Sequence, residues 1–98
     1  MEHINYVVLV GNLTRDPEQR PVGSSQVTKF SLAINGIKPE DVCFLDITCW
    51  GELANKAAML QKGQQVTVVG RLKQDTWQDK MSGEQRSRMN VVASEVCV

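Results

Sequence analysis

The sequence predicts an all-β domain: a small barrel of five strands with one short helix between the third and the fourth strand. Three observations lead to this prediction. Five segments are rich in β-branched residues or alternate between apolar and polar positions, which is typical of strands. The segment 52–62 instead repeats its apolar residues at the spacing of a helix. The chain has 98 residues, so we expect a single domain over residues 1–98.

Composition narrows the class of protein. The apolar and charged shares, 42% and 22%, are ordinary for a globular domain. No apolar run approaches the roughly 18 residues of a membrane span, and the N-terminus lacks the basic start of a signal peptide. We therefore expect no membrane partner and a cytoplasmic location. Cys43, Cys49 and Cys97 contain no Cys-x-x-Cys pair, so reduced thiols are expected rather than a metal site.

The first strand is expected over residues 4–13, which are rich in β-branched residues. Residues 14–26 follow as a long polar connection, because Pro17, Pro21 and Gly23 punctuate them.

The second and third strands are expected over residues 27–35 and 42–50, joined by a turn over residues 36–41. Because side chains alternate between the two faces of a strand, each strand should turn its apolar face inward. The inward residues would be Phe30, Leu32 and Ile34 on the second strand, and Cys43, Leu45, Ile47 and Cys49 on the third.

The helix over residues 52–62 has a good C-terminal signal, since the cation Lys62 precedes Gly63. The fourth strand is expected over residues 65–78. Gly70, in the middle of that strand, predicts a bend or bulge at a barrel corner.

A turn over residues 79–84 leads to the fifth strand, over residues 86–96. Five strands with a helix between the third and fourth have the connectivity of the OB-fold, a Greek-key barrel. In this arrangement the helix closes one end of the barrel.

Three aromatic residues carry the functional prediction. The chain has few rings, yet Phe44, Trp50 and Trp77 fall at strand positions that point away from the predicted core. Arg71 and Lys73 share the face of Trp77 on the fourth strand. Arg86 and Arg88 share one face of the fifth strand, which should pair with the fourth.

Rings interleaved with cations suit a single-stranded nucleic acid. The cations follow the phosphates, and the rings stack on unpaired bases, each stack contributing about 1–3 kcal/mol. Every base has a π-face, so this binding would not depend on sequence.

Each of these residues also has a purely structural interpretation. Trp50 fits a core position where the third strand meets the helix. Phe44 fits a subunit interface, and Trp77 fits a ring packed on its own hairpin. Arg71 and Lys73 fit a solvated strand face.

No catalytic or metal-binding set is visible. His3 is the sole histidine, and the acidic residues are scattered without ligand spacing. We therefore expect a protein that is not an enzyme and needs no cofactor.

Several stretches, in order over nearly the whole chain, are similar to one family. They are residues 8–18 (VLVGNLTRDPE), 30–33 (FSLA), 44–54 (FLDITCWGELA), 62–66 (KGQQV), 69–72 (VGRL) and 77–80 (WQDK). On these residues the chain resembles the bacterial-type single-stranded DNA-binding proteins.

The resemblance implies an OB-fold domain that wraps single-stranded DNA and protects unpaired strands in replication, recombination and repair. It implies self-association, usually into a homotetramer in which the first strand contributes to dimer pairing, with a dimer as the alternative. Phe44, Trp50 and Trp77 match the stacking positions of the family, and Lys62, Lys73 and Arg86 match its backbone-contacting positions. Arg71 is added from strand parity alone.

The chain departs from the family pattern in three ways. The turn between the second and third strands lacks the stacking aromatic of many members. Asp46, Glu52 and Asp75 fall where some members carry basic residues, which together with a net charge of zero predicts modest electrostatic affinity. Replication and repair proteins are expected partners if the full-length protein carries the family's acidic C-terminal tail.

Two other functions stay open at this point. One is a related, tail-less primosome component that binds single strands and a helicase partner as a dimer. The other is an OB-fold module that binds proteins and has little affinity for nucleic acid.

Overall fold

Six strands and one short helix make up the part of the chain that the structure describes. The structure, a computed structural model, describes residues 2–98. In order, the elements are β1 (Val7–Leu13), β2 (Glu18–Val22), β3 (Ser25–Asn35), β4 (Val42–Trp50), α1 (Glu52–Ala57), β5 (Gln65–Gln78) and β6 (Gln85–Cys97).

Five of the strands form a closed ring of pairings. β1 pairs with β5, β5 with β6, β6 with β4, β4 with β3, and β3 returns to β1 at Asn12 and Leu13. The β4–β6 pairing is parallel and the others are antiparallel. Together with the helix between β4 and β5, this ring confirms the predicted fold class.

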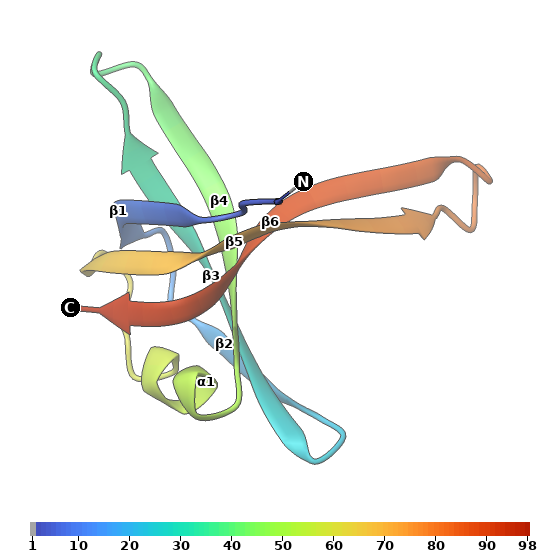
Figure 1. Cartoon of the computed structure of the whole chain (residues 1–98), viewed down its shortest axis with the longest axis horizontal. Coiled ribbons are helices and arrows are strands. Elements are labelled where there is room, and N and C mark those ends of the chain that lie inside the picture. The colour runs from blue at the N-terminus through green and yellow to red at the C-terminus, as the bar shows by residue number, and fades with distance from the viewer. Residues whose placement is uncertain (1) are drawn as a thin grey trace.

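The core lies inside the ring and continues under the helix. Leu32, Ile47, Val68 and Val91 come from four different strands and are fully buried. α1 lies at one end of the barrel (Figure 1) and adds two alanines of its own, while Leu60 follows it into the core. The predicted inward residues Phe30, Leu32, Ile47 and Cys49 are buried, and Ile34 and Leu45 are partly so.

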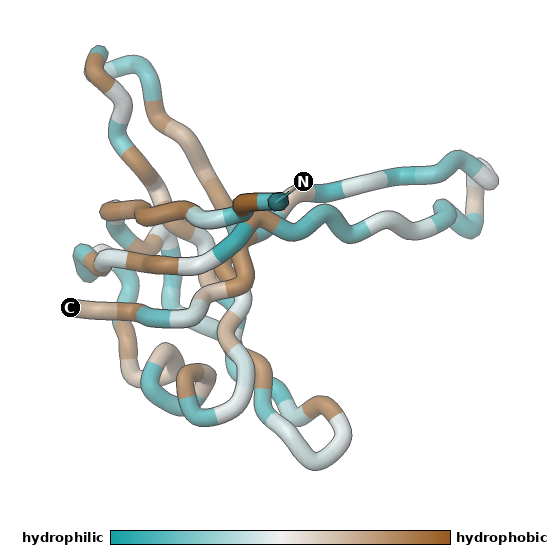
Figure 2. Tube along the Cα trace, in the orientation of Figure 1, coloured by the Kyte–Doolittle hydropathy of each residue, from teal (hydrophilic) through white to brown (hydrophobic). Residues whose placement is uncertain are grey.

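Three hairpins project from this barrel as arms (Figure 1). They are the β2–β3 arm, the β3–β4 arm and the β5–β6 arm, the last being hydrophilic along most of its length (Figure 2). The arms explain one wrong inward prediction: Cys43 is exposed, because it lies on the β3–β4 arm beyond the strands that cover Ile47 and Cys49. All three cysteines are free thiols, and burial raises the pKa of the Cys49 thiol to about 11.

The predicted polar connection over residues 14–26 is wrong in its middle, where β2 forms a hairpin with β3. All five residues of β2 are exposed, so the strand has no apolar alternation from which it could be predicted. Pro21 is tolerated because β2 is the outermost strand of the sheet, where a missing backbone N–H need not break a ladder.

The helix is shorter than predicted, since it ends at Ala57 rather than at Lys62. Residues 58–59 continue as a turn: the Leu60 N–H donates to the Ala57 carbonyl, and Leu60 still reaches the core. The apolar residues recur at helical spacing up to Leu60, but the helix itself covers only the first six residues of this segment, and a turn brings Leu60 to the core.

Gly70 marks an irregularity, as predicted. The register of β5 against β6 shifts between Val69, opposite Glu95, and Gly70, opposite Ala93. Ser94 is left without an opposite residue, and its hydroxyl donates to the Val69 carbonyl at 3.1 Å. A bulge of this kind bends the paired strands, here where β5 and β6 leave the barrel and become an arm.

Candidate nucleic-acid interface

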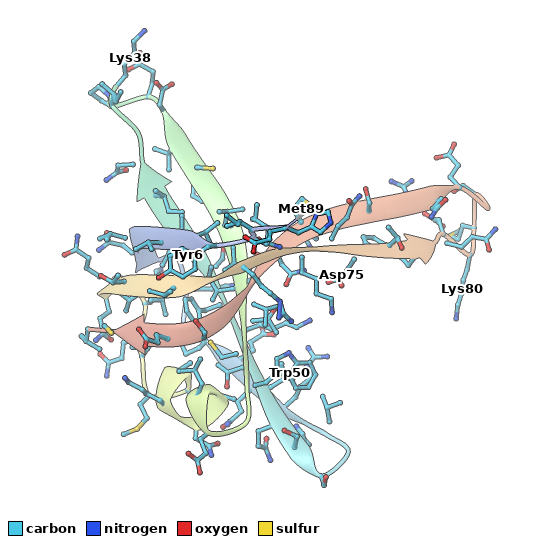
Figure 3. All side chains as sticks on the ribbon, in the orientation of Figure 1. Tyr6, Lys38, Trp50, Asp75, Lys80 and Met89 are labelled. Atoms are coloured by element: carbon cyan, nitrogen blue, oxygen red, sulfur yellow. The ribbon has the colours of Figure 1, made fainter. Side chains whose placement is uncertain are left out.

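The space between the β2–β3 arm and the β5–β6 arm contains the predicted functional face. Trp50 and Asp75 both point into this space, from β4 and from β5 (Figure 3). A hollow forms its floor, which we call the inter-arm groove. It is lined by Arg15, Glu18, Lys29, Phe30, Asp46, Thr48, Asp75, Arg88 and Asn90.

All three predicted stacking rings lie at the surface. Their exposed fractions are 66% for Phe44, 46% for Trp50 and 48% for Trp77. Phe44 and Trp50 share one face of β4 with two groove residues, Asp46 and Thr48. Trp50 lies opposite the buried Val27 on β3, so its position combines an exposed ring with a place next to the core.

The β5–β6 arm brings rings and cations together by direct cross-strand pairing. Trp77 lies opposite Arg86 and Asp75 lies opposite Arg88. Opposite residues in an antiparallel pair project to the same face. The face that carries Trp77 is therefore basic on its β6 side, as strand parity predicted.

Three cations on this face, Lys73, Arg86 and Arg88, have a carboxylate partner. The Arg88 Nε lies 3.3 Å from an Asp46 carboxylate oxygen, and the Lys73 Nζ lies 3.5 Å from one of Asp75. Farther out on the arm, the Arg86 Nε lies 2.9 Å from an Asp79 oxygen. Of the four cations predicted to contact phosphates, Lys73 and Arg86 are thus held in ion pairs within the chain.

Asn90 organises the floor of the groove and was not among the predicted site residues. Its side chain is buried, accepts from the Thr48 hydroxyl at 3.3 Å, and donates to the Asp75 carboxylate at 2.7 Å. It also donates to the Lys73 carbonyl at 3.4 Å. Its parity with Arg86 and Arg88 was the available signal, but an asparagine in a strand carries no functional pattern of its own.

Lys62 and Arg71 lie outside the inter-arm groove. The Lys62 backbone N–H donates to the Asp16 carboxylate at 2.8 Å, and the residue lines a separate hollow after the helix. Arg71 lines another hollow, together with Asn5 and Tyr6 from the segment before β1. The structure thus places Arg86 opposite Trp77 and Lys73 farther along the same face of β5, while Lys62 and Arg71 lie at other hollows. The binding roles of all seven residues stay predictions.

Asp79 fixes the turn at the tip of the β5–β6 arm. Its carboxylate accepts from the backbone N–H groups of Met81 at 2.8 Å and Ser82 at 3.4 Å, and it pairs with Arg86. These donors, the Met81 N–H first, hold the pKa of the Asp79 carboxyl below its usual value.

We expect the turn to loosen in acid. Because the folded-state pKa is lowered, the stabilisation by the Asp79 carboxylate is present above the ordinary Asp pKa of about 3.9 and is lost as the pH falls through the folded value. An NMR titration of the Asp79 carboxyl and the Met81 amide should give a midpoint below about 3.9. Asp79→Asn should abolish the Met81 response, and a wild-type midpoint at or above the ordinary value would contradict the assignment.

Two kinds of feature are absent from residues 2–98. No group of three or more His, Cys, Asp or Glu side chains is placed to hold a metal ion. Over the same residues, no helix has the length and apolar character needed to cross a membrane.

Comparison with known proteins agrees with the sequence resemblance. The model of the single-strand binding protein family matches residues 4–98. The single-stranded DNA-binding protein of Thermus aquaticus is 43% identical over 96 residues, which are 92% of this chain and 36% of that protein. The protein of the same name from Wolinella succinogenes is 39% identical over 102 residues, or 94% of this chain and 62% of the relative.

A solved structure has the same fold. The crystal structure of the wild-type single-stranded DNA binding protein from Thermus aquaticus superimposes with a TM-score of 0.78 at 36% identity. The superposition covers 95% of this chain and 39% of that one. The chain therefore spans about a third of the length of its Thermus relative and over half that of the Wolinella protein.

Proposed function

Because the chain belongs to the single-strand binding protein family, we propose that it binds single-stranded DNA without regard to sequence. The observation that carries this proposal is the β5–β6 arm. There a half-exposed ring, Trp77, lies directly opposite a cation, Arg86, on a hairpin that projects from the barrel. A ring next to a cation on a projecting, hydrophilic arm is suited to a ligand with both π-faces and negative charge.

In the proposed mechanism the aromatic rings bind the bases and the cations bind the phosphates. Phe44, Trp50 and Trp77 stack on unpaired bases, and Lys73 and Arg86 contact phosphates. Lys62 and Arg71, which lie away from the inter-arm groove, would contact a strand that continues around the barrel. Stacking accepts any base, so the chain would coat DNA rather than read its sequence.

Coating accounts for the biological role that we propose. A strand whose bases are stacked on protein cannot re-anneal and is shielded from nucleases during replication, recombination and repair. The chain would perform this role as a binding protein in the cytoplasm, without catalysis or a cofactor. Replication and repair proteins would be its partners where the full-length protein carries an acidic tail.

We further propose that the chain self-associates through β1. Within residues 2–98, Val7–Gly11 pair with β5 alone, so one edge of this part of β1 carries backbone groups without a strand partner. Val8 and Val10 are exposed on the same strand. An exposed apolar edge strand is a template for pairing with a second copy, and we propose a homotetramer built from such dimers, with a dimer as the alternative.

Titration with oligo-dT tests the binding proposal. Trp50 and Trp77 are the only tryptophans, so we expect tryptophan fluorescence to be quenched at saturation, and we expect the mass in solution to increase by that of the oligonucleotide. Duplex DNA of equal length is the control and should quench far less, because its bases are already stacked. Unchanged emission and unchanged mass with oligo-dT would favour a protein-binding module instead.

A further inference from the structure

We propose that two carboxylates of the inter-arm groove, Asp46 and Asp75, compete with DNA phosphates for cations. In the free protein Asp46 holds Arg88, which also lines the groove, and Asp75 holds its neighbour Lys73, so the incoming strand must displace both carboxylates. They would thereby limit the affinity of the groove and reduce its dependence on salt. This inference rests on the proposed single-stranded DNA binding.

The contacts show that the competition is local. Asp46 and Arg88 come from neighbouring strands, β4 and β6, and their charged groups approach to 3.3 Å. Lys73 and Asp75 lie two residues apart on β5, hence on one face, and approach to 3.5 Å. The side chains of all four remain partly exposed, so a phosphate can reach the cations.

The groove as a whole is charge-compensated. Its lining contains the basic residues Arg15, Lys29 and Arg88 and the acidic residues Glu18, Asp46 and Asp75. A site that binds a polyanion through electrostatic attraction alone would be expected to carry a surplus of cations. The equal number of acidic and basic residues in this lining therefore has to be explained if the groove binds DNA.

Asp75 in particular is held in position. One carboxylate oxygen accepts from the buried Asn90 side chain at 2.7 Å, while the other faces Lys73. The hydrogen bond to Asn90 orients Asp75 toward the cation and the inter-arm space (Figure 3). A freely rotating surface carboxylate would turn away from a bound phosphate. The hydrogen bond from Asn90 instead keeps the Asp75 carboxylate near the phosphate, where it repels it.

The consequence for salt dependence follows from counterion release. Neutralising one phosphate of a single strand releases cations and contributes about 0.7 to the slope of log affinity against log salt. When Arg88 leaves Asp46 for a phosphate, the freed carboxylate attracts a cation from solution. This uptake offsets the release, so a cation that begins in an ion pair adds less to the slope than a free one.

Asp46→Asn and Asp75→Asn test the inference, because each removes a charge and keeps an acceptor oxygen of similar shape. At low salt, each variant should bind oligo-dT about three- to tenfold more tightly than wild type, as expected from removing one negative charge near a phosphate. Each should also steepen the salt slope, by up to about 0.7. Melting curves should show that both variants fold.

Glu95→Gln is the matched control, since it makes the same change of net charge at the far end of β6, opposite Val69. It should leave the affinity and the slope close to those of wild type. If it tightens binding as much as the groove variants, the effect is one of net charge and the inference is wrong.

A double-mutant cycle separates competition from general repulsion. In an Arg88→Gln background, Asp46→Asn should tighten binding much less than in wild type, because no shared cation is left to release. An equal gain in both backgrounds, or variants that bind no more tightly than wild type, would overturn the inference. Failure of the wild-type chain to bind oligo-dT would instead refute the proposed function itself.

Discussion

Replacing Trp77 by alanine is expected to weaken binding of single-stranded DNA by about 1–3 kcal/mol, or roughly 5- to 150-fold. The ring is half-exposed on the β5–β6 arm, opposite Arg86 and away from the barrel core. Truncation therefore removes a stacking surface and no core packing. The dissociation constant for oligo-dT, measured by anisotropy, should rise while the melting temperature stays close to that of wild type.

Trp50→Ala is the informative comparison. Trp50 is also half-exposed, but it lies at the end of β4, next to α1 and opposite the buried Val27. We expect this variant to lose both affinity and thermal stability. Trp77→Phe should retain much of the affinity, because a smaller ring can still stack. A large fall in melting temperature with unchanged affinity for Trp77→Ala would show that this ring serves packing.

Strand parity predicted the directions of the functional rings because alternation is a local property. On β4, the even positions Phe44 and Trp50 face outward whatever the strand pairs with, provided that the strand is regular. The structure contains no irregularity in the register of β3 against β4 over Val27–Asn35. Where the barrel ends, the same rule failed for burial: Cys43 has the inward parity but nothing to cover it.

Features that depend on the pairing of distant strands could not be predicted from the sequence. β2 has no apolar residue pattern, and its existence depends on the ladder that β3 offers. The Arg88–Asp46 ion pair joins strands that lie far apart in sequence and meet through a parallel crossover. The carboxylates at positions 46 and 75 were visible as departures from the family pattern, but their ion pairs with Arg88 and Lys73 became visible only in three dimensions.

Gly70→Ala is expected to destabilise the fold by about 3 kcal/mol, lowering the melting temperature by roughly 12–24 °C for a domain of this size. A Cβ at this position would collide with the Val92 carbonyl oxygen and would lie 2.9 Å from the Ala93 Cα. Both obstacles are backbone of the paired strand, so no flexible side chain can yield. Thermal denaturation at one fixed protein concentration measures the effect, because self-association would also shift the transition.

Gly83→Ala separates this collision from the general cost of replacing a glycine. Gly83 lies at the tip of the β5–β6 arm with a φ of 75° and open space around it, so alanine there should cost only the strain of a left-handed backbone, about 1–2 kcal/mol. The φ of Gly70 is not positive, so alanine there would cause no left-handed strain. The larger cost of Gly70→Ala would come from the close approach of β5 and β6 alone. Because β5 and β6 leave the barrel at that crossing, a Gly70→Ala chain that still folds should also bind DNA more weakly, through a displaced arm that carries an intact Trp77. A Gly70→Ala variant as stable as wild type would mean that the two strands can separate at the bulge without loss, and that the arm is not held in place by the barrel.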